Sequence, residues 1–141
     1  MKQFFDTTVL VAAVLEEHPH HEASFALFSA VYRSTSCCAA HNLAETYATL
    51  TRYPGKNRLS SDQALLAVDA IENRLTVVAL DVAEYRAAIR KFAALGIVGG
   101  TMYDGLIAAC ALKAKAEVLY TWNTGHFTML GDEIARRVRT P

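Results

Sequence analysis

The sequence predicts an α/β fold in which a short, mostly parallel central sheet is flanked by helices. Two observations predict it. Short apolar runs of strand length alternate along the chain with longer stretches that have the apolar spacing of helices. The chain has 141 residues, of which 52% are hydrophobic and 20% charged, a size and balance that suit one domain with a real core. We therefore expect a single domain over residues 1–141.

The individual elements follow from composition and from the residues that bound them. Expected strands cover residues 2–5, 35–39, 76–80 and 117–121, and the Arg-rich tail adds a short edge strand. Expected helices cover residues 9–15, 22–32, 43–52, 61–72, 82–95 and 102–114. The third helix ends at Tyr53-Pro54-Gly55. In such sheets ligands bind beyond the carboxyl ends of the strands, which places Asp6 and Asn123 at the same edge.

Charge and sorting signals narrow the class of protein. Fourteen basic and fourteen acidic side chains give a net charge of zero, so any contact with nucleic acid is local or assisted by a metal ion. The amino-terminal apolar stretch is interrupted at Asp6 and followed by Glu16-Glu17, unlike a signal peptide, and it is too short to span a membrane. We expect a cytoplasmic protein. Cys37 and Cys38 are expected to pack as free thiols in a buried strand.

The acidic residues allow two interpretations. A polar residue followed three positions later by an acid or glutamine is typical of a helix start. Four pairs fit this pattern: Asn42/Glu45, Ser60/Gln63, Asp81/Glu84 and Thr101/Asp104. On spacing alone, Glu45 and Asp104 could be helix caps and nothing more, and Asp6 could cap the first helix.

The surroundings favour a second interpretation, a divalent-metal site. Asp6 lies between Phe4-Phe5 and an apolar helix, and Asp104 opens a helix that is apolar over its next two turns. Burying a bare carboxylate is costly, and neither acid has a lysine or arginine beside it in sequence. Mg²⁺ or Mn²⁺, which both prefer oxygen ligands, would supply the missing charge.

Four segments also resemble, in order, the motifs of PIN-domain ribonucleases, and most of all the VapC toxins of bacterial toxin–antitoxin pairs. The segments are FFDTTVL (4–10), LAETY (43–47) with LTR (50–52), YDGLIAA (103–109), and LYTWN (119–123) with HF (126–127). Each motif alone is weak, but the ordered set spans almost the whole chain.

The resemblance implies a metal-dependent endoribonuclease that hydrolyses RNA through metal-activated water and leaves a 5′-phosphate and a 3′-hydroxyl. Asp6, Glu45, Asp104 and Asn123 would be the catalytic and metal-binding residues. Supporting or substrate-binding residues would be Thr7, Thr8, Thr121 and Arg52. The implied partners are RNA, an antitoxin and a second copy of the chain in a homodimer.

Two positions depart from the family pattern. Relatives often have an aspartate where this chain has the neutral Asn123, and an acid where it has His126. An asparagine can still bind a metal through its carbonyl oxygen. The site would carry less negative charge and hold a second metal ion more weakly.

Other functions fit less well. A phosphatase of the haloacid dehalogenase type, with Asp6 as nucleophile, usually has a second acid where Thr8 stands. A catalytically silent PIN scaffold or binding module remains an alternative, although retention of all three acids favours an enzyme. His18, His20 and His21 fit a solvated turn around Pro19 better than a metal site.

Aromatic side chains are the remaining candidates for contacts. Those of Tyr32, Tyr47, Tyr53 and Trp122 could stack on unpaired bases, although at least half of them are expected in the core. Phe25, Phe28, Tyr32 and Tyr47 could form a homodimer face or an antitoxin groove, with core packing the expected role of each.

Overall fold

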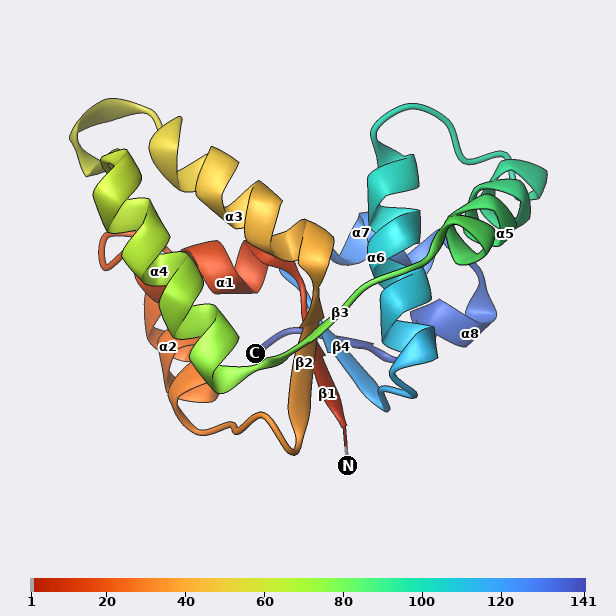
Figure 1. Cartoon of the computed structure of the whole chain (residues 1–141), viewed down its shortest axis with the longest axis horizontal. Helices are drawn as coiled ribbons and strands as arrows, with labels where there is room; N and C mark the ends of the chain where they lie inside the picture. The colour runs from red at the N-terminus through yellow and green to blue at the C-terminus, as the bar shows by residue number, and fades with distance from the viewer. Residues whose placement is uncertain (1) are drawn as a thin grey trace.

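The computed structural model describes residues 2–141 and contains one five-stranded sheet in the order β3-β2-β1-β4-β5 (Figure 1). Its strands are β1 (Gln3–Phe5), β2 (Ser36–Ala39), β3 (Thr76–Val78), β4 (Val118–Tyr120) and β5 (Val138–Arg139). Every neighbouring pair is parallel. The α/β prediction is confirmed, including the short edge strand in the tail.

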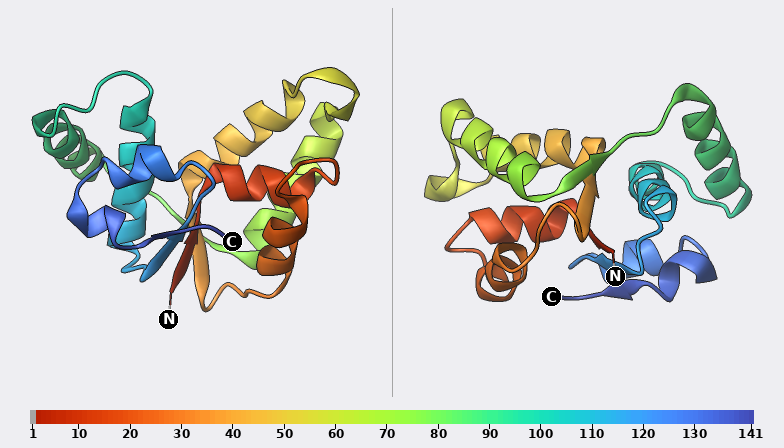
Figure 2. Two further views of the ribbon diagram at one scale, coloured as in Figure 1. Left: turned by 180° about the vertical axis from the view of Figure 1, so that it is seen from behind. Right: turned by 60° about the horizontal axis from the view of Figure 1, so that its bottom comes forward.

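The helices form two groups, with α1 to α4 on one side of the strands and α5 to α8 on the other (Figures 1 and 2). Their bounds are α1 (Thr7–Val14), α2 (His21–Ser29), α3 (Ala40–Thr51), α4 (Ser61–Arg74), α5 (Val82–Ala94), α6 (Thr101–Lys113), α7 (Thr124–Thr128) and α8 (Asp132–Ala135). A 3₁₀ turn covers Gly55–Asn57. The six predicted helices are present, whereas α7, α8 and the 3₁₀ turn were not predicted because each is too short to show an apolar period.

Strand β1 lies at the centre and fixes the position of the site. Gln3 is in register with Ser36 of β2 and with Val118 of β4. Because the three strands run in parallel and end at the same edge, the residues that follow them lie close together. Asp6, the start of α3 and Thr121 therefore meet at one edge of the sheet.

Side chains of β1 and β2 alternate between two hydrophobic clusters. Phe4 and Cys37 pack with Phe92 on one side, and Phe5 and Cys38 pack on the other. This alternation is the two-residue period of a strand, and it separates the adjacent cysteines as predicted. Cys37, Cys38 and Cys110 are free thiols. Burial raises the pKa of Cys38 to about 12, which makes this thiol unreactive.

Helices α5 and α6 pack closely at Gly105. A Cβ atom placed on Gly105 would lie 2.8 Å from Cδ2 of the Phe92 ring, and Phe92 is fully buried. The glycine therefore lets α6 approach α5 at the turn that carries Asp104.

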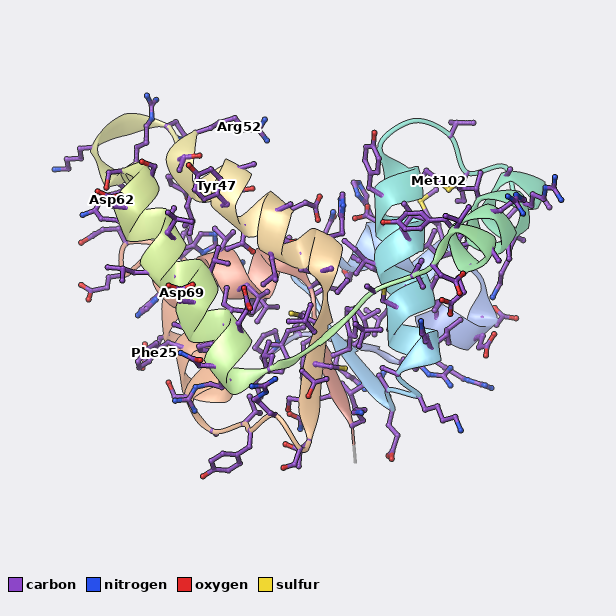
Figure 3. All side chains as sticks on the ribbon, viewed as in Figure 1. Phe25, Tyr47, Arg52, Asp62, Asp69 and Met102 are labelled. Atoms are coloured by element: carbon purple, nitrogen blue, oxygen red, sulfur yellow. The ribbon has the colours of Figure 1, made fainter. Side chains whose placement is uncertain are left out.

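The aromatic predictions were partly wrong. Phe25 is 51% exposed and Tyr32 is 68% exposed, so neither is a core residue. Figure 3 shows Phe25 on the outer side of α2. Phe28 and Tyr47 are partly buried against core clusters, as expected. No helix within residues 2–141 is long and apolar enough to cross a membrane.

Candidate active site

Polar side chains from four elements gather at the carboxyl edge of the sheet. Asp6 follows β1 directly and is the cap of α1, and Glu45 lies in the second turn of α3, which follows β2. Asp104 lies in the first turn of α6, and Asn123 precedes α7. A charge interaction between Asp6 and Asp104, and a hydrogen bond between Thr7 and Glu45, connect residues far apart in sequence.

Asp6 is a buried carboxylate held by three hydrogen bonds. The residue is only 3% exposed. Its Oδ2 accepts hydrogen bonds from Thr121 Oγ1 at 2.8 Å, from Thr8 Oγ1 at 2.9 Å and from Thr8 N at 3.4 Å. Burial raises the pKa of Asp6 to about 6, and the nearby charge of Asp104 adds to the rise, while the threonine hydrogen bonds oppose it. The ionised form of Asp6 is thus destabilised in the absence of a cation.

Asp104 sits beside a histidine and an amide. Burial raises its pKa, while the hydrogen bond and charge of His126, and the charge of His41, lower it. Nδ1 of His126 lies 3.1 Å from Asp104 Oδ2 and 2.8 Å from Asn123 Nδ2. One ring nitrogen cannot donate to the carboxylate and accept from the amide at once. Protonation at Nδ1 therefore decides whether His126 bonds Asp104 or Asn123.

A relay of hydrogen bonds holds Glu45. The backbone N–H of Ala39 donates to Asn42 Oδ1 at 2.7 Å, Asn42 Nδ2 donates to Thr7 Oγ1 at 2.9 Å, and Thr7 Oγ1 donates to Glu45 Oε1 at 2.9 Å. Nε2 of His41 lies 3.7 Å from Glu45 Oε2. The end of β2 is in this way coupled to the orientation of Glu45.

Helix capping does not account for Glu45 and Asp104. Ser60/Gln63 and Asp81/Glu84 form the reciprocal cap predicted from their spacing. The cap residue of α3 is Ala39, and Asn42, three residues later, bonds its backbone N–H instead of that of Glu45. Helix α6 begins at Thr101 with no side-chain cap on Gly100. Glu45 and Asp104 therefore do not cap their helices, which favours a role in the site.

The predicted supporting residues divide into two sets. The hydroxyls of Thr7, Thr8 and Thr121 all bond a site carboxylate. Arg52 is an exposed residue at the far end of α3, and its side chain lies away from the sheet in Figure 3. Within residues 2–141, it makes no hydrogen bond or ion pair with the acids, and its contact with substrate stays a prediction.

Three residues of the site were missed or misread from sequence. Asn42 is predicted to begin its helix and pair with Glu45, but it lies three residues after the cap residue Ala39, is fully buried, and bonds Ala39 N and Thr7. His41 and Tyr103 stack across the site with ring centroids 5.6 Å apart, although they lie on different helices. His41 could have been found from the sequence, because it lies one helical turn before Glu45. No local pattern indicated that Tyr103 stacks on it.

The donor chemistry of the site fits a divalent cation. Among the described residues, no lysine or arginine pairs with Asp6, Glu45 or Asp104; Glu45 and Asp104 each have a histidine beside them, and Asp6 forms no ion pair. Carboxylates and an amide oxygen are ligands that Mg²⁺ and Mn²⁺ accept. Within residues 2–141, His, Cys, Asp and Glu side chains form no group of three arranged to hold a metal. Asn123 and water would supply further oxygen ligands to a bound cation.

The sequence is similar to a family model and to named relatives. The family model described as PIN domain matches residues 4–128. Ribonuclease VapC40 of Mycobacterium tuberculosis is 37% identical over 117 residues, covering 81% of each chain. Ribonuclease VapC27 of the same species is 32% identical over 114 residues, covering 80% of this chain and 79% of its own length.

Solved structures agree with this fold. The crystal structure of M. tuberculosis VapC20, described as a Sarcin-Ricin loop cleaving toxin, has a TM-score of 0.72 and 17% identity, covering 89% of this chain and 92% of its own. A chain of DNA-bound VapBC from Salmonella typhimurium has a TM-score of 0.69 and 21% identity, covering 99% of this chain and 98% of its own.

Proposed function

This chain belongs to the PIN-domain family, and we propose that it is an Mg²⁺- or Mn²⁺-dependent endoribonuclease that acts in the cytoplasm as the toxin of a toxin–antitoxin pair. The observation that carries the proposal is the proximity of two desolvated acids, Asp6 and Asp104, neither of which is paired with a lysine or arginine among the described residues. Relatives that are 32–37% identical and carry the name ribonuclease support the choice of RNA as substrate.

The residues of the chain divide the work at the site. Asp6, Glu45, Asp104 and Asn123 are the proposed ligands of the metal. A bound Mg²⁺ or Mn²⁺ would lower the pKa of water and neutralise charge on the attacked phosphate. Thr8 and Thr121 fix Asp6 in one orientation, and Thr7 does the same for Glu45. Because these orienting bonds exist before substrate arrives, little reorganisation is needed during the reaction.

His126 holds Asp104 from the solvent side. Its ring can donate to the carboxylate or release it to bond Asn123. In the position where related chains often have an acid, this histidine lowers the negative charge of the site. A second metal ion would accordingly bind more weakly than the first.

The proposed protein partners are an antitoxin and a second copy of the chain. Exposed Phe25 and Tyr32 border a cavity of about 530 Å³ between α2 and α4, away from the acids. Exposed aromatic residues are favourable contacts for a partner. An antitoxin that placed an arginine among the carboxylates would pair with them and replace the metal.

The experiment compares the wild-type protein with Asp104→Asn, which removes a charge but keeps the shape. Purified wild type should cleave RNA with Mg²⁺ or Mn²⁺ and not with EDTA, and Asp104→Asn should lose about a thousandfold or more, because metal stabilisation of the reaction is worth several kcal/mol. Asp81→Asn is the matched control at an acid outside the site. Folded wild type that leaves RNA intact would favour a silent scaffold.

The toxin role is tested separately in cells. Expression of wild type should arrest bacterial growth, Asp104→Asn should not, and co-expression of a small DNA-binding protein encoded beside the gene should restore growth. Unimpaired growth with abundant active nuclease would rule out the toxin role and leave the nuclease.

A further inference from the structure

A cavity of about 350 Å³ adjoins the catalytic edge and has no role in the chemistry described so far. The residues that define it here, called the indole cavity, are Thr8, His20, Thr49, Tyr53, Trp122 and Asn123. Its volume is within the range of small-molecule sites. None of the lining side chains that the structure describes is acidic, unlike the catalytic edge beside it.

Two of the lining residues are also part of the catalytic network. Thr8 Oγ1 bonds Asp6, and Asn123 lies beside His126 and Asp104. A phosphodiester held at the acids would therefore have an attached nucleoside within reach of the cavity. Thr8 and Asn123 therefore belong both to the cavity lining and to the acidic site.

Trp122 is held in a fixed position in this cavity. Its backbone N–H donates to Thr8 Oγ1 at 2.9 Å, and its indole Nε1 donates to the fully buried Ser24 Oγ at 2.8 Å. The backbone of Trp122 is thus anchored by the same hydroxyl that orients Asp6, and its indole ring by Ser24 of α2. A fixed ring loses little conformational entropy when a ligand stacks on it.

The indole already takes a flat, conjugated partner. The ring of His20 stacks on Trp122 at a centroid distance of 3.7 Å and an interplanar angle of 8°. His20 is exposed and lies in the turn before α2. The imidazole occupies the position that a nucleobase would take if it displaced His20 from the indole.

We propose that the indole cavity is a nucleobase subsite, which binds by stacking an unpaired base of the RNA next to the phosphodiester that is cleaved. The inference rests on the proposed nuclease function and specifies its substrate as single-stranded at this nucleotide. A base inside a duplex is stacked on both faces and cannot reach Trp122, whereas a base in a loop can.

Binding is measured first without cleavage. Trp122 is the sole tryptophan of the chain, so its fluorescence reports on this cavity alone. In EDTA, single-stranded oligoadenylate, oligocytidylate or oligouridylate should change the emission, and an abasic oligomer or an RNA duplex of the same length should not. Asp81→Asn protein, with its change outside the site, should respond in the same way as wild type.

Two variants then test the cavity by opposite changes. Trp122→Leu removes the stacking surface, and Thr49→Phe fills the cavity while leaving Trp122 in place. Each should lower kcat/KM on single-stranded RNA by about 5- to 150-fold, the loss expected for one base–aromatic stack of 1–3 kcal/mol. Tyr85→Leu, at an exposed tyrosine of α5, is the control and should keep wild-type efficiency. Thermal midpoints identify any variant that is poorly folded.

The outcomes separate this subsite from the nuclease proposal. Wild-type kcat/KM in both cavity variants would overturn the subsite and leave the nuclease intact. Wild type that responds to single-stranded RNA in EDTA but never cleaves it would overturn the nuclease and retain the subsite. Variants that cleave normally but escape inhibition by an antitoxin would assign the cavity to a protein partner, against the proposal.

Discussion

At the start of α5, Asp81 is exposed and Glu84 partly exposed, and each accepts from the other's backbone N–H. Glu84 also pairs with Lys113 at 2.7 Å. The hydrogen bond to the backbone of Asp81, followed by that from Lys113, lowers the pKa of Glu84. At the start of α1, Asp6 is buried, has no cationic partner among residues 2–141, and its pKa is raised to about 6.

Glu84 and Asp6 both lie at helix starts, in patterns typical of capping. Their charges nevertheless have opposite effects on the stability of the folded protein. The ionised form is stabilised at α5 and destabilised at α1. Burial and the presence or absence of a counter-charge decide the sign, not the spacing of residues. A buried acid that lowers the stability of its own fold is typical of a functional site.

The largest predicted effect is on the stability of the metal-free protein at Asp6. The folded protein binds more protons at this residue than the unfolded chain between about pH 4 and 6, so the free energy of unfolding falls as the pH rises through that window. Above it, Asp6→Asn should stabilise the protein in EDTA by up to about 3 kcal/mol, the equivalent of a pKa rise from 3.8 to about 6. Urea unfolding at pH 7.5 and pH 4 measures this.

The gain should largely disappear at pH 4, where Asp6 is protonated in the folded wild type. Equal destabilisation at both pH values would mean that Asn breaks the threonine hydrogen bonds and that charge is not the cause. The charge of Asp6 would then not destabilise the folded protein, and the contrast with Glu84 at the start of α5 would be lost.

A second effect, of similar or smaller size, is expected from metal. Mn²⁺ at a hundred times its Kd should stabilise wild type by about 2.7 kcal/mol, because it binds the folded state and relieves the charge at Asp6 and Asp104. Thermal melts in Mn²⁺ and in EDTA measure the shift, and Asp104→Asn should show less of it. The same midpoint with and without metal would contradict a metal site at this edge.

The smallest effect is expected at α5. Asp81→Ala removes the side chain that accepts from Glu84 N at 2.8 Å, and loss of such a cap costs about 1 kcal/mol. Thermal melts should show a lower midpoint, the opposite sign to Asp6→Asn, with RNA cleavage unchanged. A stabilised Asp81→Ala protein would show that the two helix starts do not differ as described.

Much of the architecture could be predicted because it depends on local pattern. The strand around Phe4-Phe5 and the strand around Cys37-Cys38 have the apolar character of buried parallel strands, and they are central in the sheet. Asp6 and Asn123 could be placed at one edge because each follows a parallel strand. The short helices α7 and α8 could not be predicted, since neither is long enough to carry a period.

The candidate residues of the site came from the sequence, whereas the contacts between them could not be predicted. The acids were identified from their apolar surroundings and from the motif resemblance. The relay from Ala39 through Asn42 and Thr7 to Glu45 depends on how α1 packs on α3, which no local pattern encodes. The stack of His20 on Trp122 joins residues 102 positions apart (122 − 20), so the sequence could indicate only a solvated turn.

Gly105 has a consequence for the genetics of this protein. Any larger residue there would meet the buried Phe92 ring and force α6 away from α5, taking the adjacent Asp104 with it. Under the proposed function, cells selected to survive expression of the toxin should yield substitutions at this glycine alongside those at the acids. Substitutions at Gly105, which has no side chain, would then inactivate the toxin as those at the carboxylates do, because the backbone of Gly105 fixes the position of Asp104.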